Sequence, residues 1–148
     1  MSKYIRVLTR RSLRWNTIKE GHYTKNNTLK RFIRKGIPSD RRVAVWMATS
    51  GADRLRNESP LTYQDLRKKV NNKALIETIQ IDLPRTFPDN IYFTSHEYLP
   101  QQLFNVLATF SHQNTEVGYC QGLNYIAGLL LLATKSEVFG TTQVTHEV

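Results

Sequence analysis

The chain has 148 residues, of which 40% are hydrophobic and 22% are charged, and this composition is typical of one globular domain. The longest uncharged apolar stretch, Ile126 to Ala133, is too short to cross a bilayer, which takes about 20 residues. Cys120 is the single cysteine, so an internal disulfide is excluded, and the four histidines show no metal-ligand spacing. We therefore expect a cytoplasmic protein without a metal site.

The net charge of +9 is concentrated at the N-terminus. Residues 1–35 contain eleven Lys/Arg and one acid, whereas the rest of the chain is nearly neutral. We predict a basic arm over residues 1–27, and a solvated charged helix or frayed end is its favoured interpretation. Contact with an anionic membrane surface, an acidic protein face or a mitochondrial import machinery stays open. Nucleic-acid binding is not expected, because Tyr4, Trp15 and Tyr23 are isolated and offer no stacking series.

Apolar residues three and four positions apart predict two helices after the arm. The first covers residues 28–35 and ends at Gly36. Ser39 or Asp40 is expected to cap the second helix, which ends at Gly51. Its expected buried face consists of Val43, Trp46 and Met47.

Prolines mark the boundaries of the next helices. Ser59 is expected to cap a helix that has Pro60 at its first position and runs to about Val70. Another helix ends before Pro84, because a residue that precedes proline avoids helical backbone angles. The apolar residues of that helix are Leu75, Ile76, Ile79 and Leu83. Residues 86–90 have the composition of a turn.

Two further helices are predicted before the chain ends. One begins near Pro100, and the other opens at Gly118 and is apolar nearly all round, which predicts burial on every side. The buried side of the former consists of Leu103, Val106, Leu107 and Phe110. Residues 136–148 lack this pattern and form a divergent tail. Because no alternating strand pattern occurs, we predict an all-α fold.

Few residues form a recognisable catalytic or ligand-binding motif. The sequence has no Gly-rich phosphate-binding loop, so nucleotide binding by this chain alone is not expected. Cys120 is predicted to be a small core thiol, not a nucleophile activated by His96 or His112. Without further context, Arg85 would be a surface cation at a helix exit, and Gln121 a polar residue at a helix start.

Three sequence blocks change that interpretation. They are RKGIPSDRRVAVWMATSGA at residues 34–52, IQIDLPRTFPDN at residues 79–90 and VGYCQGLNYIAG at residues 117–128. In this order and at these separations they resemble the TBC domain of Rab GTPase-activating proteins, through its R-x-G-I-P-x-x-x-R-x-x-V-W, I-x-x-D-x-x-R and Y-x-Q patterns. The first block matches at Arg34, Gly36, Ile37, Pro38, Arg42, Val45 and Trp46. We predict structural roles for Arg34, Gly36, Pro38, Arg42 and Trp46.

The resemblance implies a two-lobed helical domain that activates a Rab-type small GTPase in vesicle trafficking. It further implies that Arg85 is an arginine finger and Gln121 a glutamine finger, both lent to the active site of the partner. Asp82 is expected to support Arg85. Tyr119 and Gln121 are expected on different faces of a helix, one packed and one pointing out. Magnesium and GTP would belong to the partner, so no cofactor of this chain is expected.

The resemblance covers residues 28–135, which is about the first half of such a domain, and it predicts a shortened form. Part of the last helix would then lack its covering helices, at Leu123, Ile126, Leu130 and Leu131. Peripheral contact with endomembranes through the basic arm stays open. So does an alternative function, an inactive fragment or binding module that holds a small GTPase or another partner without turnover.

Overall fold

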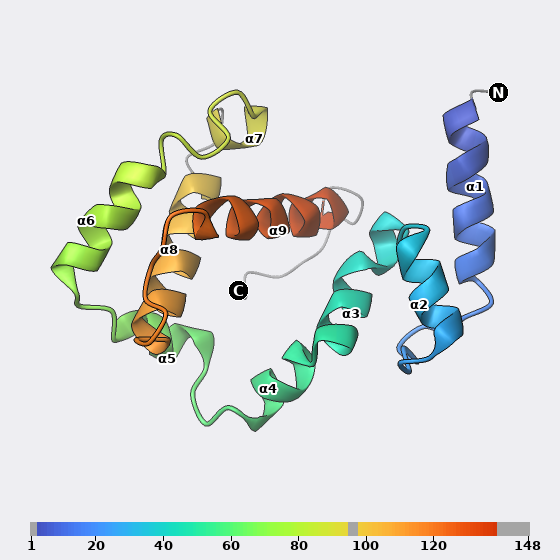
Figure 1. Ribbon diagram of the computed structural model, residues 1–148, viewed down its shortest axis with the longest axis horizontal. Helices are drawn as coiled ribbons and strands as arrows, with labels where there is room; N and C mark the ends of the chain where they lie inside the picture. The colour runs from blue at the N-terminus through green and yellow to red at the C-terminus, as the bar shows by residue number, and fades with distance from the viewer. Residues whose placement is uncertain (1–2, 95–97, 139–148) are drawn as a thin grey trace. The chain divides into compact units, whose positions relative to one another are not determined.

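The computed structural model describes residues 3–94 and 98–138, the last four by their backbone alone, and all regular secondary structure in these residues is helical (Figure 1). The predicted all-α fold is therefore confirmed. The chain divides into two compact units, Met1–Ser59 and Pro60–Val148, each with its own hydrophobic core. None of the helices in the described residues is long and apolar enough to cross a membrane.

The first unit contains α1 (Lys3–Trp15), α2 (Asn27–Arg34), α3 (Ser39–Ser50) and α4 (Ala52–Glu58). The predicted α2 is confirmed to within one residue at each end. Asn26 caps its start by accepting a 2.8 Å hydrogen bond from the backbone N–H of Leu29. Gly36 follows its end with a φ of 101°, a left-handed angle that glycine adopts without steric cost.

The start of α3 differs from the prediction. Its N-cap residue is Pro38, so Ser39 is already helical and neither Ser39 nor Asp40 is the cap. Gly51 ends α3 with a φ of 87°, as predicted. Val45 is the fully buried residue of this helix. The predicted face of Val43, Trp46 and Met47 is only half-buried.

Helix α4 was not predicted, because its polar sequence ADRLRNE has no apolar stripe. Two ion pairs at helical spacing accompany it. Arg56 Nη2 lies 3.1 Å from Asp53 Oδ1, and Arg54 Nε lies 3.7 Å from Glu58 Oε1. Such pairs stabilise an exposed helix by a few tenths of a kcal/mol each, about 0.2 to 0.5.

Trp15 ties the N-terminal segment to the rest of the first unit. Its side chain is fully buried, and its Nε1 donates a 3.0 Å hydrogen bond to the carbonyl oxygen of Gly36. Arg41 Nη1 donates to the carbonyl oxygens of Trp15 and Ile18 at 2.9 and 2.8 Å. The core of this unit consists of Trp15, Tyr23, Leu29, Phe32, Ile37 and Val45. The segment predicted as an arm thus supplies two aromatic residues to the core.

The second unit contains α5 (Tyr63–Lys68), α6 (Lys73–Asp82), α7 (Ile91–Thr94), α8 (Tyr98–Gln113) and α9 (Leu123–Val138). Helix α8 packs against α5, α6, α7 and α9, so it is the centre of this unit. The fully or nearly fully buried core residues are Ile79, Phe93, Leu99, Leu103, Leu107 and Ala108. The predicted helix before Pro84 is confirmed as α6, and residues 86–90 form turns and bends.

The prediction that Ser59 and Pro60 begin a helix is wrong. Helix α5 begins at Tyr63, and its N-cap is Thr62, whose hydroxyl accepts from the backbone N–H of Asp65 at 3.2 Å. The Asp65 carboxylate accepts from the backbone N–H of Thr62 at 3.1 Å in return. This reciprocal capping box satisfies two helix-end donors, whereas a proline start satisfies none.

Helix α8 exposes one residue that was predicted to be buried. Phe110 is 41% exposed, whereas Thr109 and Ser111 beside it are buried. The buried side of α8 follows Leu99, Leu103 and Leu107 at intervals of four, so the apolar pattern that placed Phe110 in the core was one position off.

Helix α9 begins at Leu123, not at Gly118, and its burial is one-sided. Leu123 and Leu131 pack against the core of the second unit, but Ile126 and Leu130 are 61% and 48% exposed. Burial on every side is therefore wrong for the described residues, while the exposure of Ile126 and Leu130 agrees with the prediction that covering helices are lacking at these two positions. Of the predicted tail, residues 136–138 continue α9, and residues 139–148 lie outside the described residues.

Candidate functional site

A buried carboxylate at the end of α6 holds two of the other predicted site residues. Asp82 is 3% exposed. Its Oδ1 accepts a 2.9 Å hydrogen bond from Arg85 Nε and a second one from Nη2, and its Oδ2 accepts a 2.6 Å hydrogen bond from the Tyr119 hydroxyl. Each carboxylate oxygen thus has its own partner, which fixes the plane of the carboxylate.

The local sequence explains why Arg85 leaves the helix. Helix α6 ends at Asp82, and Pro84 cannot donate the hydrogen bond that would continue it. The Thr86 hydroxyl donates a 2.7 Å hydrogen bond to the carbonyl oxygen of Asp82, which satisfies one of the free acceptors at the helix end. Arg85 therefore lies in a turn, with 54% of its side chain exposed.

Asp82 and Tyr119 keep each other in defined protonation states. The hydrogen bond from Tyr119 is the largest cause that lowers the pKa of Asp82, burial opposes it, and Arg85 adds to the lowering. Burial, together with the neighbouring Asp82 carboxylate, raises the pKa of Tyr119 well above its usual value. At neutral pH Asp82 is therefore charged, and Tyr119 is protonated and able to donate.

A second set of hydrogen bonds joins the turn after α6 to the start of α9. Asn124, on α9, is 1% exposed, and its Nδ2 donates a 2.7 Å hydrogen bond to the Thr86 hydroxyl. Its Oδ1 accepts a 3.0 Å hydrogen bond from the backbone N–H of Gly122. Asn124 thus connects the turn that carries Arg85 to the turn that carries Gln121. Sequence analysis missed Thr86 and Asn124, although an amide within the most apolar helix was a usable signal.

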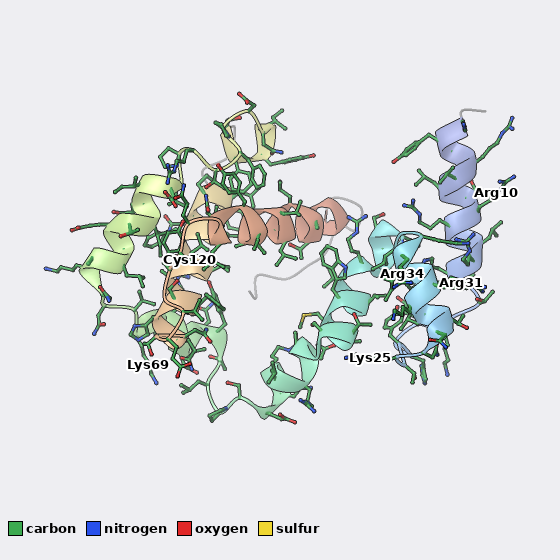
Figure 2. The ribbon with its side chains drawn as sticks, viewed as in Figure 1. Arg10, Lys25, Arg31, Arg34, Lys69 and Cys120 are labelled. Atoms are coloured by element: carbon green, nitrogen blue, oxygen red, sulfur yellow. The ribbon has the colours of Figure 1, made fainter. Side chains whose placement is uncertain are left out.

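Gln121 is exposed and lies in the turn immediately before α9. Tyr119, two residues earlier, is half-buried and also precedes the helix. The prediction that one of them packs while the other points out is confirmed. The reason given for it, that both lie on a helix, is wrong. Cys120, which Figure 2 labels, lies between them and is exposed, so the prediction of a core thiol is wrong as well.

Aromatic packing fixes the turn after Arg85 against α9. Phe87 has a φ of 53°, which is rare for a residue with a side chain, and its ring centroid lies 5.6 Å from those of Phe93 and Tyr125. A Cβ atom built on Gly128 would lie 2.9 Å from the Phe87 ring. The absence of a side chain at position 128 therefore lets this turn approach α9 closely.

The residues of the first motif block all belong to the first unit. Gly36 accepts the hydrogen bond from Trp15, Pro38 starts α3, and the Arg42 guanidinium lies 5.9 Å from the centre of the Trp46 ring. Arg34 is exposed and lines a cavity of about 520 Å³ beside α2. Nothing in these contacts depends on the second unit.

Neither this cavity nor a second one of about 420 Å³, lined by residues of α6, α7 and α8, is lined by Arg85 or Gln121. Among the described residues, no three His, Cys, Asp or Glu side chains come together in a manner that could hold a metal ion. Arg85 and Gln121 are both exposed.

Comparison with known proteins agrees with the three motif blocks. The family model of the Rab-GTPase-TBC domain matches residues 39–142. The chain is 47% identical to growth hormone-regulated TBC protein 1-A of Danio rerio over 93% of this chain and 40% of the relative, and 42% identical to growth hormone-regulated TBC protein 1 of Homo sapiens over 92% and 41%. It is 36% identical to the GTPase-activating protein GYP3 of Saccharomyces cerevisiae over 77% of this chain and 20% of the relative.

No solved structure matches the chain significantly. The chain spans about 40% of the length of the growth hormone-regulated relatives, and within that span all three motif blocks are present. The sequence match and the all-helical fold together show that the chain belongs to the RabGAP-TBC family, the Rab-GTPase-TBC domain proteins.

Proposed function

We propose that this chain stimulates GTP hydrolysis by a Rab-type small GTPase, and that Arg85 and Gln121 enter the partner's active site. The main support is the contact network around Asp82 and Thr86, which holds the Arg85 turn beside the turn that carries Gln121. The name of the yeast relative, a GTPase-activating protein, agrees with this activity.

The chemistry of phosphoryl transfer explains what an arginine would contribute. Negative charge spreads over the γ-phosphate oxygens as the bond to GDP loosens, so a guanidinium stabilises the transition state more than the bound GTP. In known GTPases this contribution is about 10³- to 10⁵-fold in rate, or roughly 4 to 7 kcal/mol of barrier. The amide of Gln121 would orient the attacking water. Magnesium and GTP would be bound by the partner.

The resting contact of Arg85 with Asp82 agrees with this role. The guanidinium has five N–H donors, and Asp82 accepts from Nε and Nη2, so donors remain for a phosphate. A side chain whose position is already restricted loses less entropy on entering the partner than a free arginine would. Tyr119 in turn restrains Asp82 through the opposite carboxylate oxygen.

The proposal is tested by phosphate release from a panel of GTP-loaded Rab proteins, with the yeast GTPase-activating protein GYP3 as positive control. Arg85→Lys keeps the charge but removes the guanidinium fork, and Gln121→Ala removes the amide. Each should lower the stimulated rate by at least about tenfold while binding to the GTP-loaded partner is retained. The exposed pair Arg67→Lys and Gln113→Ala is the matched control, and these variants should be as active as the wild type.

The alternative is a non-catalytic binding module, and one observation favours it. Four large apolar side chains of α9 are exposed, and they form a surface on which a partner could pack without turnover: Tyr125, Ile126, Leu129 and Leu130. If the wild type binds a GTP-loaded Rab protein that GYP3 activates, yet leaves hydrolysis at its intrinsic rate, the alternative holds. If no Rab protein of the panel is bound, the chain neither stimulates nor holds a Rab-type GTPase.

A further inference from the structure

Helix α1 is exposed over most of its length and carries two opposed surfaces. Residues 3–10 are all exposed. Because successive helical residues are rotated by 100°, most of the apolar side chains and the basic side chains of this segment lie on opposite sides of the helix. One side consists of Tyr4, Ile5 and Leu8, which are 69%, 47% and 38% exposed. The opposite side consists of Lys3, Arg6 and Arg10. Val7 and Leu13 lie outside these two sets.

The positive charge of this helix is not neutralised within the described part of the chain. The segment from Lys3 to Lys19 contains six Lys/Arg and no acid. The ion pairs of the described residues lie within α4 and between Asp82 and Arg85. Arg14 is engaged differently, since its guanidinium lies 5.7 Å from the centre of the Phe32 ring. The charges available to a partner are therefore those on the first two turns.

The other end of α1 is anchored. Trp15 is buried and bonded to Gly36, and Arg41 holds the carbonyl oxygen of Trp15. The guanidinium of Arg11 lies against Gly36, within 3.0 Å of where a Cβ atom would be. The C-terminal end of α1 is therefore held within the first unit, and its first two turns remain exposed. Figure 2 labels Arg10 on this helix.

We propose that α1 binds an anionic membrane surface, with Tyr4, Ile5 and Leu8 inserted among the lipids and Lys3, Arg6 and Arg10 directed at the headgroups. An apolar side opposite a basic side is the pattern of helices that lie in the membrane interface, and arginine side chains are long enough to reach the phosphates from there. A nucleic acid would use the charge but would leave the apolar side in water. This inference does not depend on the proposed stimulation of GTP hydrolysis.

The test is co-sedimentation of the whole chain with vesicles of phosphatidylcholine alone and of phosphatidylcholine with 30 mol% phosphatidylserine, which contain no GTPase. We expect binding to the anionic vesicles, with the affinity falling as salt rises from about 0.1 to 0.5 M because the charges are screened. Arg6→Gln with Arg10→Gln should weaken binding by about fivefold per arginine. The matched control, Lys68→Gln with Lys69→Gln at the C-terminal end of α5, removes the same charge and should bind like the wild type.

A second variant pair separates membrane insertion from simple charge attraction. Ile5→Ser with Leu8→Ser leaves the charge unchanged and alters exposed side chains, so it should fold normally and yet lose most of its vesicle binding. Circular dichroism confirms the helical content of every variant. The proposal is overturned if no vesicle is bound, if both vesicle types are bound equally, or if this pair binds like the wild type. Tighter binding to duplex DNA that is unaffected by Ile5→Ser with Leu8→Ser would overturn it in favour of a nucleic acid.

Discussion

The hydroxyl of Tyr119 donates a 2.6 Å hydrogen bond to Oδ2 of Asp82, a residue 37 positions earlier in the chain. This contact joins the segment between α8 and α9 to the end of α6. Arg85 donates to the other oxygen of the same carboxylate. The position of Arg85 therefore depends on Tyr119, which acts through Asp82. The two motif blocks that carry Arg85 and Gln121 are thereby one structural unit.

Removal of the Tyr119 hydroxyl should therefore destabilise the second unit. Tyr119→Phe leaves the ring in place and deprives a buried carboxylate of one partner, so the free energy of unfolding should fall by about 1.5 to 3 kcal/mol. Urea unfolding of Tyr119→Phe, Asp82→Asn and the double variant measures the coupling. Strict additivity of the two single effects would show that the hydrogen bond contributes nothing.

The stability contributed by Asp82 should vanish in acid. Its pKa is lowered from 3.8 in the folded chain, so the charged form stabilises the fold fully above pH 3.8 and progressively less as the pH falls through the lowered pKa. The difference in unfolding free energy between the wild type and Asp82→Asn should be constant from pH 5 to 7 and should shrink below about pH 4. A difference that persists unchanged to pH 2 would contradict the assignment.

The Asn124 link should affect activity more than binding. Thr86→Val has the same shape as threonine but removes the hydroxyl that accepts from Asn124 and donates to the carbonyl oxygen of Asp82. If the chain stimulates GTP hydrolysis as proposed, this variant should lower the stimulated rate by about tenfold with little change in affinity, because a small misplacement of Arg85 costs mainly transition-state stabilisation. Thr78→Val on the exposed side of α6 is the control and should leave both quantities unchanged.

Position 128 should not tolerate a methyl group. Alanine favours a helix over glycine by about 1 kcal/mol, yet its Cβ atom would lie 2.9 Å from the Phe87 ring. We expect Gly128→Ala to lower the free energy of unfolding by about 1 to 3 kcal/mol, the usual cost of overpacking. In a Phe87→Leu background the same substitution should be less harmful, which thermal melts of the four proteins would measure. Equal effects in both backgrounds would show that the ring is not the obstacle.

The local signals that proved reliable were those that act over a few residues. Gly36 and Gly51 end their helices because glycine adopts left-handed angles without steric cost, and Pro84 marks the exit of α6 because proline cannot continue the hydrogen bonding. Asp82 was expected to support Arg85, and in the structure the two residues form an ion pair. The cap predicted at Ser59 was wrong, because Thr62 and Asp65 form a reciprocal capping box that begins α5.

The sequence by itself determined the helical class, the ends of α2, α3 and α6, and the family, since each depends on short-range preferences or on motif order. Only the tertiary structure decided that Trp15 belongs to a core and that Cys120 is exposed. It also decided the contacts of Asp82 with Tyr119 and of Thr86 with Asn124, which are 37 and 38 residues apart. Such contacts arise from how α6, α8 and α9 pack, and no periodicity within a single helix encodes them.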